Sequence, residues 1–290
     1  MTRTALITGC SSGLGAAAAR LFAARGWNVV ATMRRPEDAA ALGFPANVLV
    51  ARLDVQDRAS IAEAVAFGIA RFGGIDAVVN NAGFGLFGVF EGTPREKVLE
   101  QFDVNVFGLM DVVRAVLPHF RAKRAGTIVN VGSGAGVFTL PMLSLYCASK
   151  FALEGFSEAL AYEVADLGIA VRIVEPGGVP ETGFGRRNGV EAGAVEPLAD
   201  YAAFVEASGA VYAELYALSA HTTAEAVAEV IHEAATDPTD RLRYVVGDAI
   251  RPMVEARRET SEAEYLALMR RRFAPKLPAA DCRCEAGGAA

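Results

Sequence analysis

Three features are missing from this chain of 290 residues, and each absence excludes a class of protein. No apolar run approaches the ~18 residues that a membrane-spanning helix needs. Positive charge is not in excess, since 28 Lys and Arg stand against 34 Asp and Glu, and the net charge of −6 argues against a nucleic-acid surface. A secretory signal is not expected either, because Thr4–Thr8 already reads as a strand that runs into glycines. We therefore predict a cytoplasmic protein with no nucleic-acid partner and no membrane span.

Cysteine and histidine are scarce, with four and three residues. Cys10 and Cys147 lie inside motif stretches, where small buried thiols are expected. Cys282 and Cys284 form a C-x-C in an Ala/Gly-rich tail, and no histidine stands at metal-ligand spacing to them. The sequence therefore predicts neither a disulfide framework nor a metal site.

Small apolar residues are abundant, and 52% of the chain is hydrophobic. Such a composition is typical of a parallel sheet with helices on both faces. Short apolar runs alternate with helical patterns, which predicts an α/β fold with a doubly wound, Rossmann-type parallel sheet and ligands at the carboxyl ends of its strands. The predicted strands are 4–8, 28–32, 48–53, 75–80, 127–131, 170–175 and 242–246, and the predicted helices are 15–25, 58–72, 95–120, 145–167, 223–235 and 261–273.

The strand–helix rhythm breaks between residues 180 and 220, which are rich in Gly, Ala and aromatic residues without strand alternation. A loop of this length without secondary structure is usually functional or mobile, which favours a substrate lid. With no internal repeat and no linker in view, we predict one catalytic domain over 1–273 that carries this insertion. Residues 274–290 are predicted to be a disordered tail.

Tyr146 and Lys150 stand four residues apart on a predicted helix, so their side chains share one face. A neighbouring ammonium favours the phenolate and lowers the phenol pKa from about 10, which suits a group that passes a proton near neutral pH. The same spacing is common on solvated helices, so the pair alone leaves both interpretations open. Ser133 follows the strand 127–131, where its hydroxyl could donate to a substrate carbonyl.

A glycine-rich stretch separates the first strand from the first helix. Glycines there let the backbone approach a pyrophosphate at the helix N-terminus. The spacing Gly-x-x-x-Gly-x-Gly departs from G-x-G-x-x-G, and a turn without a ligand is the alternative. The residues predicted to contact a dinucleotide are Thr8, Gly9, Ser11, Ser12, Gly13, Leu14 and Gly15.

The end of the second strand bears on the type of cofactor. An acid there binds the ribose 2′-hydroxyl of NAD, whereas an arginine accommodates the 2′-phosphate of NADP. Arg34 and Arg35 follow this strand, and the first carboxylate is Glu37. We predict that NADP(H) is preferred over NAD(H) and that Arg34 binds the phosphate; a solvated pair of charges is the alternative.

Two further asparagine sites stand out. Asn80-Asn81-Ala82-Gly83 ends the fourth strand, where polar amides can hold the backbone and a cofactor. Asn105 lies inside the predicted helix 95–120, where Asn is a poor helix former. A local backbone bond without a function would also explain it.

Taken in order, these motifs resemble the short-chain dehydrogenase/reductase family over about residues 3–180. The residues that carry the resemblance are Thr-Gly-x-x-x-Gly-x-Gly at 8–15, Asp54, Asn-Asn-Ala-Gly at 80–83, Asn105, Ser133, Tyr146-x-x-x-Lys150 and Pro176-Gly177. The resemblance implies a hydride transfer between NAD(P)(H) and a carbonyl or an alcohol, by a homodimer or homotetramer. The glycine loop, Thr-Met-Arg34, the run 175–178 and the segment 241–247 are similar to the NADP-preferring hydroxysteroid and retinol dehydrogenase branch, and bacterial-type relatives look equally similar.

The family resemblance also implies a role for each site residue. Tyr146 would be the acid/base, Ser133 would position the substrate oxygen, Lys150 would lower the Tyr146 pKa and bind the nicotinamide ribose, and Asn105 would hold a water in the proton relay. Further cofactor contacts would come from Asp54, Val55, Asn81, Ala82, Gly83, Pro176, Gly177, Val179 and Thr182. The loop to Thr182 is one residue longer than the family pattern, because Pro180 and Glu181 intervene.

Three apolar stretches could line a pocket for an apolar substrate: 84–90, 138–143 and 180–220. Ordinary packing beneath long loops fits the same composition. We predict an NADP(H)-dependent oxidoreductase that interconverts a carbonyl and a primary or secondary alcohol on an apolar substrate. The alternatives are a non-catalytic NADP-binding regulatory protein, which would lack Ser133, Tyr146 or Lys150, and an epimerase or lyase on the same fold.

Overall fold

Seven parallel strands form a single sheet in the order β3-β2-β1-β4-β5-β6-β7. The computed structural model describes residues 2–274, and for Arg186, Arg187, Asn188 and Val190 it describes the backbone only. The strands are β1 (Thr4–Ile7), β2 (Asn28–Met33), β3 (Val48–Arg52), β4 (Ala77–Asn80), β5 (Gly126–Val131), β6 (Ile169–Pro176) and β7 (Arg243–Val246).

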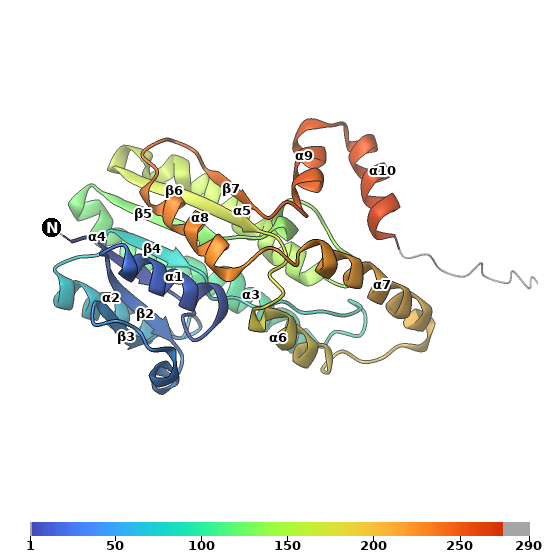
Figure 1. The fold of residues 1–290 in the computed structure, drawn as a ribbon, viewed down its shortest axis with the longest axis horizontal. Coiled ribbons are helices and arrows are strands. Elements are labelled where there is room, and N and C mark those ends of the chain that lie inside the picture. The colour runs from blue at the N-terminus through green and yellow to red at the C-terminus, as the bar shows by residue number, and fades with distance from the viewer. Residues whose placement is uncertain (1, 275–290) are drawn as a thin grey trace, which may run out of the picture.

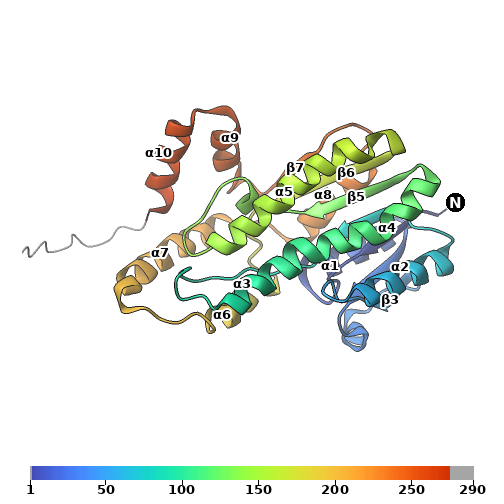
Figure 2. The ribbon, with the colours of Figure 1, turned by 180° about the vertical axis from the view of Figure 1, so that it is seen from behind.

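Helices cover both faces of the sheet, as Figures 1 and 2 show from opposite sides. One face carries α1 (Gly13–Ala24) and α8 (Ala224–Thr236), which pack against each other. The other face carries α2 (Arg58–Phe72), α4 (Leu109–Lys123) and α5 (Ser144–Val164). The predicted doubly wound fold is therefore confirmed.

The buried apolar residues divide into two layers because successive strand residues point to opposite faces. Val29 packs in the core under α1 and α8, whereas its neighbour Val30 packs in the core under α2, α4 and α5. Both faces of the strands are thus buried, which explains why the strands read as continuous apolar runs.

The strand order reverses between β1 and β4, which lie side by side although five elements (α1, β2, the 3₁₀ turn Pro36–Leu42, β3 and α2) separate them in the chain. The glycine loop after β1 and the loop after β4 therefore start next to each other. The backbone amide of Thr8 donates to the carbonyl of Val79 at 3.0 Å. Such a reversal opens a crevice at the carboxyl edge of the sheet, where dinucleotides bind.

One prediction of secondary structure is wrong, and another is confirmed with one local difference. The segment 180–220 is not a loop, because it contains α6 (Gly183–Ala192), a 3₁₀ turn (Ala199–Tyr201) and α7 (Ala202–Leu218). Its missing strand alternation did not exclude a helix, and the alanines of α7 are strong helix formers. The predicted helix 95–120 is confirmed as one helical run, in which a π-helical turn (Asp103–Gly108) joins α3 (Arg95–Phe102) to α4.

The chain ends with two helices, α9 (Arg251–Glu259), which was not predicted, and α10 (Glu262–Phe273). They lie at the same end of the molecule as α7 (Figure 1). Phe138, which follows the turn after β5, stacks on Phe273 at 6.3 Å between ring centroids and shares an apolar cluster with Val211 and Leu215 of α7. The predicted tail 274–290 lies outside the described residues except for Ala274.

Short 3₁₀ turns link other elements, at Pro36–Leu42, Gly134–Gly136 and Ala165–Leu167. Within residues 2–274, none of the helices has the length and apolar character that a membrane crossing requires.

Replacing Gly168 tests the turn that joins α5 to β6. Gly168 has φ 72°, and a Cβ placed there would lie 2.3 Å from the Arg124 carbonyl oxygen. We expect Gly168→Ala to lower the free energy of unfolding by about 2 kcal/mol or more. The control is Gly209→Ala in α7, where a Cβ meets nothing within 4 Å. There we expect alanine to raise the free energy of unfolding by about 0.5–1 kcal/mol. Urea unfolding measures the stability of both variants. A Gly168→Ala variant as stable as wild type would contradict the expected backbone strain at this position.

Candidate active site

Helix α5 holds Tyr146 and Lys150 on one face at the end of β5, and both residues are 7% exposed. The Lys150 Nζ donates to the carbonyl oxygen of Val131, the last residue of β5, at 2.8 Å. The same nitrogen lies 5.8 Å from the centroid of the Tyr146 ring. The four-residue spacing therefore brings the phenol and the ammonium into one buried site.

Ser133 completes this group two residues after β5. It begins the 3₁₀ turn Gly134–Gly136, where its hydroxyl accepts the Ala135 amide at 3.1 Å. The side chain of Ser133 also lies close enough to the Tyr146 hydroxyl to lower the pKa of that phenol. The structure thus joins Ser133, Tyr146 and Lys150, as the sequence predicted.

Burial decides the electrostatics of the site. It raises the pKa of Tyr146 to about 12, against the opposing effect of the Ser133 side chain. Burial also lowers the pKa of Lys150 to about 8, although the carboxylate of Glu154 opposes that shift. The net shift of the Tyr146 pKa is therefore upward and not downward as predicted, because the cost of burying the phenolate exceeds the stabilisation that its neighbours give it.

The three apolar stretches meet around Tyr146. Phe184 of α6 lies 5.5 Å from the Tyr146 ring, between centroids. Tyr212 of α7 packs edge-on to Phe87 at 4.8 Å, and its hydroxyl donates to the Pro141 carbonyl at 2.5 Å. Phe184 of α6 and Tyr212 of α7 therefore both belong to the apolar surroundings of the Tyr146 ring.

Asn105 lies in the π-helical turn, and its bonds reach a distant loop. Its Oδ1 accepts the Phe84 amide at 3.0 Å, and its Nδ2 donates to the Phe84 carbonyl at 2.8 Å and to the Ser149 hydroxyl at 3.1 Å. The side chain thus ties the loop after β4 to α5, which excludes the local backbone bond considered above. Ser149 was missed, and its only signal was a small polar residue beside Lys150.

Thr8 and Asn81 hold the loops after β1 and β4 together. The Thr8 hydroxyl accepts the amides of Asn81 and Ala82, both at 3.0 Å, and the Asn81 Nδ2 donates to the Thr8 carbonyl at 2.9 Å. A Cβ on Gly15 would lie 2.3 Å from the Gly9 carbonyl oxygen, so only glycine fits there.

The N-terminus of α1 suits a phosphate group. Gly13 begins α1 with φ 53°, and the preceding residue, Ser12, caps none of the first amides with its side chain. Free amides at a helix start favour an anion. The longer loop nonetheless brings Thr182 here, since its Cγ2 lies 3.5 Å from the position of a Cβ on Gly13. Thr182 is held by two bonds to the Val179 carbonyl, at 3.1 Å from its amide and 2.9 Å from its hydroxyl.

The other predicted cofactor residues lie along the same edge of the sheet. Arg34 follows β2, is exposed, and forms no hydrogen bond or ion pair with any residue between 2 and 274, whereas Arg35 pairs with Asp38 at 3.0 Å. Asp54 follows β3, and its carboxylate accepts the Gln56 amide at 3.1 Å. Val55 is buried against Gly108, and Gly83 lies beside Asn105. Gly177 follows Pro176, and the Gly177 amide donates to the Val246 carbonyl at 2.9 Å. Ser11 and Leu14 lie in the glycine loop and the first turn of α1.

Cys10 and Cys147 are buried free thiols, as the sequence predicted. Over the described part of the chain, no three His, Cys, Asp or Glu residues are grouped to hold a metal ion. Cys282 and Cys284 lie outside that part.

Comparison with known proteins agrees with this geometry. The family model described as short chain dehydrogenase matches residues 3–190. The chain belongs to the short-chain dehydrogenase family. Its members are NAD(P)-dependent dehydrogenases and reductases, and this chain is an oxidoreductase of that type.

Among the relatives is an uncharacterised oxidoreductase of Schizosaccharomyces pombe, 39% identical over 242 residues that span 83% of this chain and 99% of that one. Human retinol dehydrogenase 8 is 40% identical over 186 residues, 61% of this chain and 59% of that one.

Two solved structures share the fold closely. A short-chain dehydrogenase from Streptomyces avermitilis superposes with a TM-score of 0.73 at 34% identity, over 86% of this chain and 90% of that one. The closed form of a serine dehydrogenase complexed with NADP⁺ superposes with a TM-score of 0.71 at 29% identity, over 83% of this chain and 93% of that one.

Replacing Thr8 tests the junction between the two loops. Thr8→Val keeps the shape of the side chain but leaves the amides of Asn81 and Ala82 without an acceptor. We therefore expect the free energy of unfolding to fall by about 2–4 kcal/mol. Thr8→Ser keeps the hydroxyl and is expected to stay within about 1 kcal/mol of wild type. Urea unfolding measures stability, and we also expect the Kd of NADPH, measured by its fluorescence, to rise at least about tenfold in the valine variant alone. A valine variant that matched the serine variant would show that the hydroxyl is not needed.

Proposed function

We propose that this enzyme transfers a hydride between NADP(H) and a carbonyl or alcohol on an apolar substrate, with Tyr146 passing the proton. The observation that supports it most is that Ser133 and the buried ammonium of Lys150 both lie beside Tyr146, at the carboxyl edge of β5. A regulatory protein would not need to bring these three groups together.

The roles follow from the chemistry of each group. The Ser133 hydroxyl holds the substrate oxygen, and the Tyr146 phenol donates its proton to that oxygen as negative charge develops. Lys150 supplies a cation that stabilises the phenolate left behind, and its ammonium would also hold the ribose hydroxyls of the cofactor. A bound nicotinamide supplies or accepts the hydride. Because burial keeps Tyr146 protonated at neutral pH, the site suits reduction of a carbonyl there.

The cofactor residues would act as a rigid frame. Thr8, Gly9, Gly13 and Gly15 shape the loop for a pyrophosphate, with Ser11, Ser12 and Leu14 at the start of α1. Asp54, Val55, Asn81, Ala82 and Gly83 would surround the adenosine, and Pro176, Gly177, Val179 and Thr182 would hold the nicotinamide end. Asn105 would hold a water for the proton relay in addition to its bonds to Phe84.

The preference for NADP(H) is supported by Arg34, the cation without a partner after β2. Its planar fork can bind a phosphate through two parallel hydrogen bonds. A structural neighbour, the serine dehydrogenase, was solved with NADP⁺.

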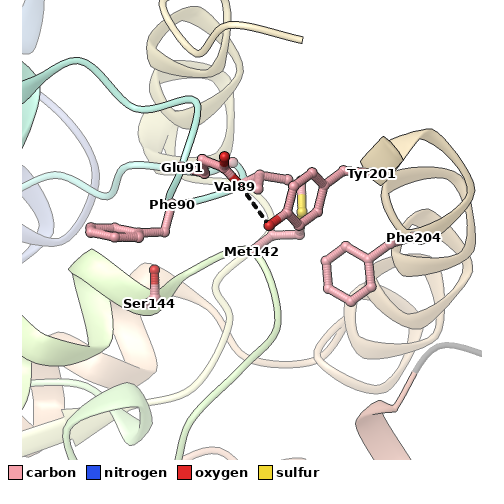
Figure 3. Close-up of a pocket in the computed structure, with 8 residues that line it drawn as sticks. Val89, Phe90, Glu91, Met142, Ser144, Tyr201 and Phe204 are labelled. Carbon is pink, nitrogen blue, oxygen red and sulfur yellow. Dashed lines mark hydrogen bonds between the residues drawn. The ribbon is translucent and has the colours of Figure 1, made fainter. Parts of the chain in front are cut away.

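An apolar substrate is supported by the walls of a pocket beside the site. This pocket has a volume of about 480 Å³ and lies between the loop after β4, the start of α5 and α7 (Figure 3); Ser144, two residues before Tyr146, lines it, whereas Ser133, Tyr146 and Lys150 do not. Its apolar lining includes Val89, Phe90, Met142 and Phe204, and its one ion is Glu91, which accepts the Tyr201 hydroxyl at 2.9 Å. One relative is named a retinol dehydrogenase, and retinol is an apolar alcohol. We assign α6 and α7 the role of the substrate lid in a single catalytic domain.

A homodimer or homotetramer is supported by large apolar side chains that face outward on neighbouring helices. Phe107 is 52% exposed, and Phe151 and Tyr162 on α5 are 38% and 76% exposed. Covering them with a second copy would bury apolar surface.

Tyr146→Phe tests the proton transfer. Because the variant keeps the ring but loses the proton, we expect kcat for carbonyl reduction to fall by about 10²–10⁴ while the Kd of NADPH stays within twofold. The assay follows nicotinamide absorbance over a panel of apolar and hydrophilic carbonyls. Tight NADPH binding without turnover of any carbonyl by wild type would favour a regulatory protein, and faster turnover of small hydrophilic carbonyls would refute the apolar substrate.

Arg34→Ala tests the cofactor preference. We expect kcat/KM for NADPH to fall by about 10–100-fold, since a charge-assisted hydrogen bond contributes about 1.5–3 kcal/mol, while kcat/KM for NADH changes little. Arg35→Ala is the matched control, because Arg35 already pairs with Asp38. A wild-type enzyme that prefers NADH would overturn the assignment.

A further inference from the structure

A second group of ionisable side chains lies directly behind the site, and the proposed reaction does not use it. Glu154 follows Lys150 by one turn of α5, and Glu175 precedes Pro176 at the end of β6. The side chain of Glu154 is 9% exposed and that of Glu175 is fully buried. Two buried carboxylates side by side are costly unless protons or cations compensate their charge.

Two arginines from later in the chain reach these acids. Arg243 of β7 places its Nε 2.9 Å from Glu154 Oε2 and 3.6 Å from Glu175 Oε1, so one nitrogen lies between the two carboxyl groups. Arg258 of α9 donates to Glu175 Oε1 at 2.5 Å. Arg243 also pairs with Glu158, a half-exposed residue on the next turn of α5.

The remaining oxygens have no donor. Glu154 Oε1 and Glu175 Oε2 are buried, and neither has a hydrogen-bond partner among the described residues. Within ion-pair distance, three acids (Glu154, Glu158 and Glu175) meet only two arginines (Arg243 and Arg258), because the nearby ammonium of Lys150 donates to the Val131 carbonyl instead. One proton on the buried pair would balance the charge of this group and give one of the bare oxygens a hydrogen to share.

The pair also supports the turn that carries Ser133. A Cβ on Gly132 would lie 3.2 Å from Glu154 Oε1, and a Cβ on Gly136 would lie 3.1 Å from Glu154 Cγ. The Glu154 side chain therefore fills the space under the backbone on both sides of Ser133, which glycine leaves open.

We propose that Glu154 and Glu175 hold one proton between them at neutral pH and act as a positioning pair, which supports the Ser133 turn and keeps a net negative charge away from Lys150. Neither residue contacts substrate, so both act through Ser133 and Lys150. The catalytic part of this proposal rests on the proposed function, and the proton itself does not.

The electrostatics agree with this geometry. Burial, followed by the charge of Glu175, raises the pKa of Glu154 to about 7. The groups that face the pair are Lys150 and Glu158 on α5, Arg243 on β7 and Arg258 on α9. Loss of the proton would leave a negative charge one helical turn from Lys150 and would disfavour the Tyr146 phenolate.

The proton can be detected without an activity assay. At pH 7 we expect the infrared spectrum to show the carbonyl stretch of a protonated, buried carboxyl group, and we expect Glu154→Gln to remove it. Glu158→Gln is the matched control, since Glu158 lies on the same helix and pairs with the same arginine but is half-exposed. A wild-type spectrum without the band, or a band that Glu154→Gln leaves intact, would overturn the proposal.

Stability against pH gives a second readout. A folded-state pKa of about 7 against 4.5 for the free acid means that the folded chain binds the extra proton, so this group's contribution to stability falls as pH rises between 4.5 and 7. The ratio of the folding equilibrium constant of Glu154→Gln to that of wild type should therefore rise at least about tenfold from pH 5 to pH 8. The same gain in Glu158→Gln, or none in Glu154→Gln, would count against the shared proton.

Double substitution separates a shared proton from two ordinary ion pairs. If one acid is already protonated, Glu154→Gln or Glu175→Gln alone should change Tm little at pH 7, because glutamine replaces the neutral partner. The double variant leaves Arg243 and Arg258 without a buried carboxylate, and its loss in Tm should exceed the sum of the single losses. Large, additive losses from the single variants would refute the pair.

The pH profile of kcat/KM tests positioning. For alcohol oxidation we expect the inflection attributed to Tyr146 to lie at lower pH in Glu154→Gln than in wild type, with kcat/KM at pH 7 within about threefold of wild type. Glu158→Gln should keep the wild-type profile. An unmoved inflection beside a confirmed infrared band would reject the positioning role alone, and an inactive wild type would reject the proposed function alone.

Discussion

The site depends on the buried hydrogen bond between the Lys150 ammonium and the carbonyl of Val131. A buried ammonium without a partner is expensive, so α5 cannot slide along the sheet without losing this bond. With α5 fixed against β5, Tyr146 lies at Ser133 one turn before Lys150, and Glu154 lies under the same turn one turn after it. One contact therefore sets the register of every group that the chemistry needs.

Most polar side chains of the site also hold the protein together. Thr8 and Asn81 join the loops after β1 and β4, and Asn105 joins the loop after β4 to α5. Each satisfies backbone groups that would otherwise be buried without partners. The frame is thus largely built before any cofactor arrives, and reactivity is left to a few groups whose pKa values are shifted by burial.

The fold was predictable because its causes are local and periodic. Strand runs, helix patterns and the glycine loop depend on residues close in sequence, and their order implied the doubly wound sheet. The errors arose where local patterns are ambiguous. The alanine-rich segment of α7 fits a loop or a helix, and no local pattern marked the π-helical turn at Asp103–Gly108, from which Asn105 reaches Phe84.

The sequence by itself determined the sheet, the glycine loop and the grouping of Ser133, Tyr146 and Lys150, because motif order and helical spacing encode them. Only the tertiary structure decided the direction of the Tyr146 pKa, since that depends on how deeply α6 and α7 bury the phenol. It also brought Glu154 and Glu175 beside Arg243 and Arg258. These contacts join elements that are far apart in the chain. They result from tertiary packing, which local sequence patterns do not predict.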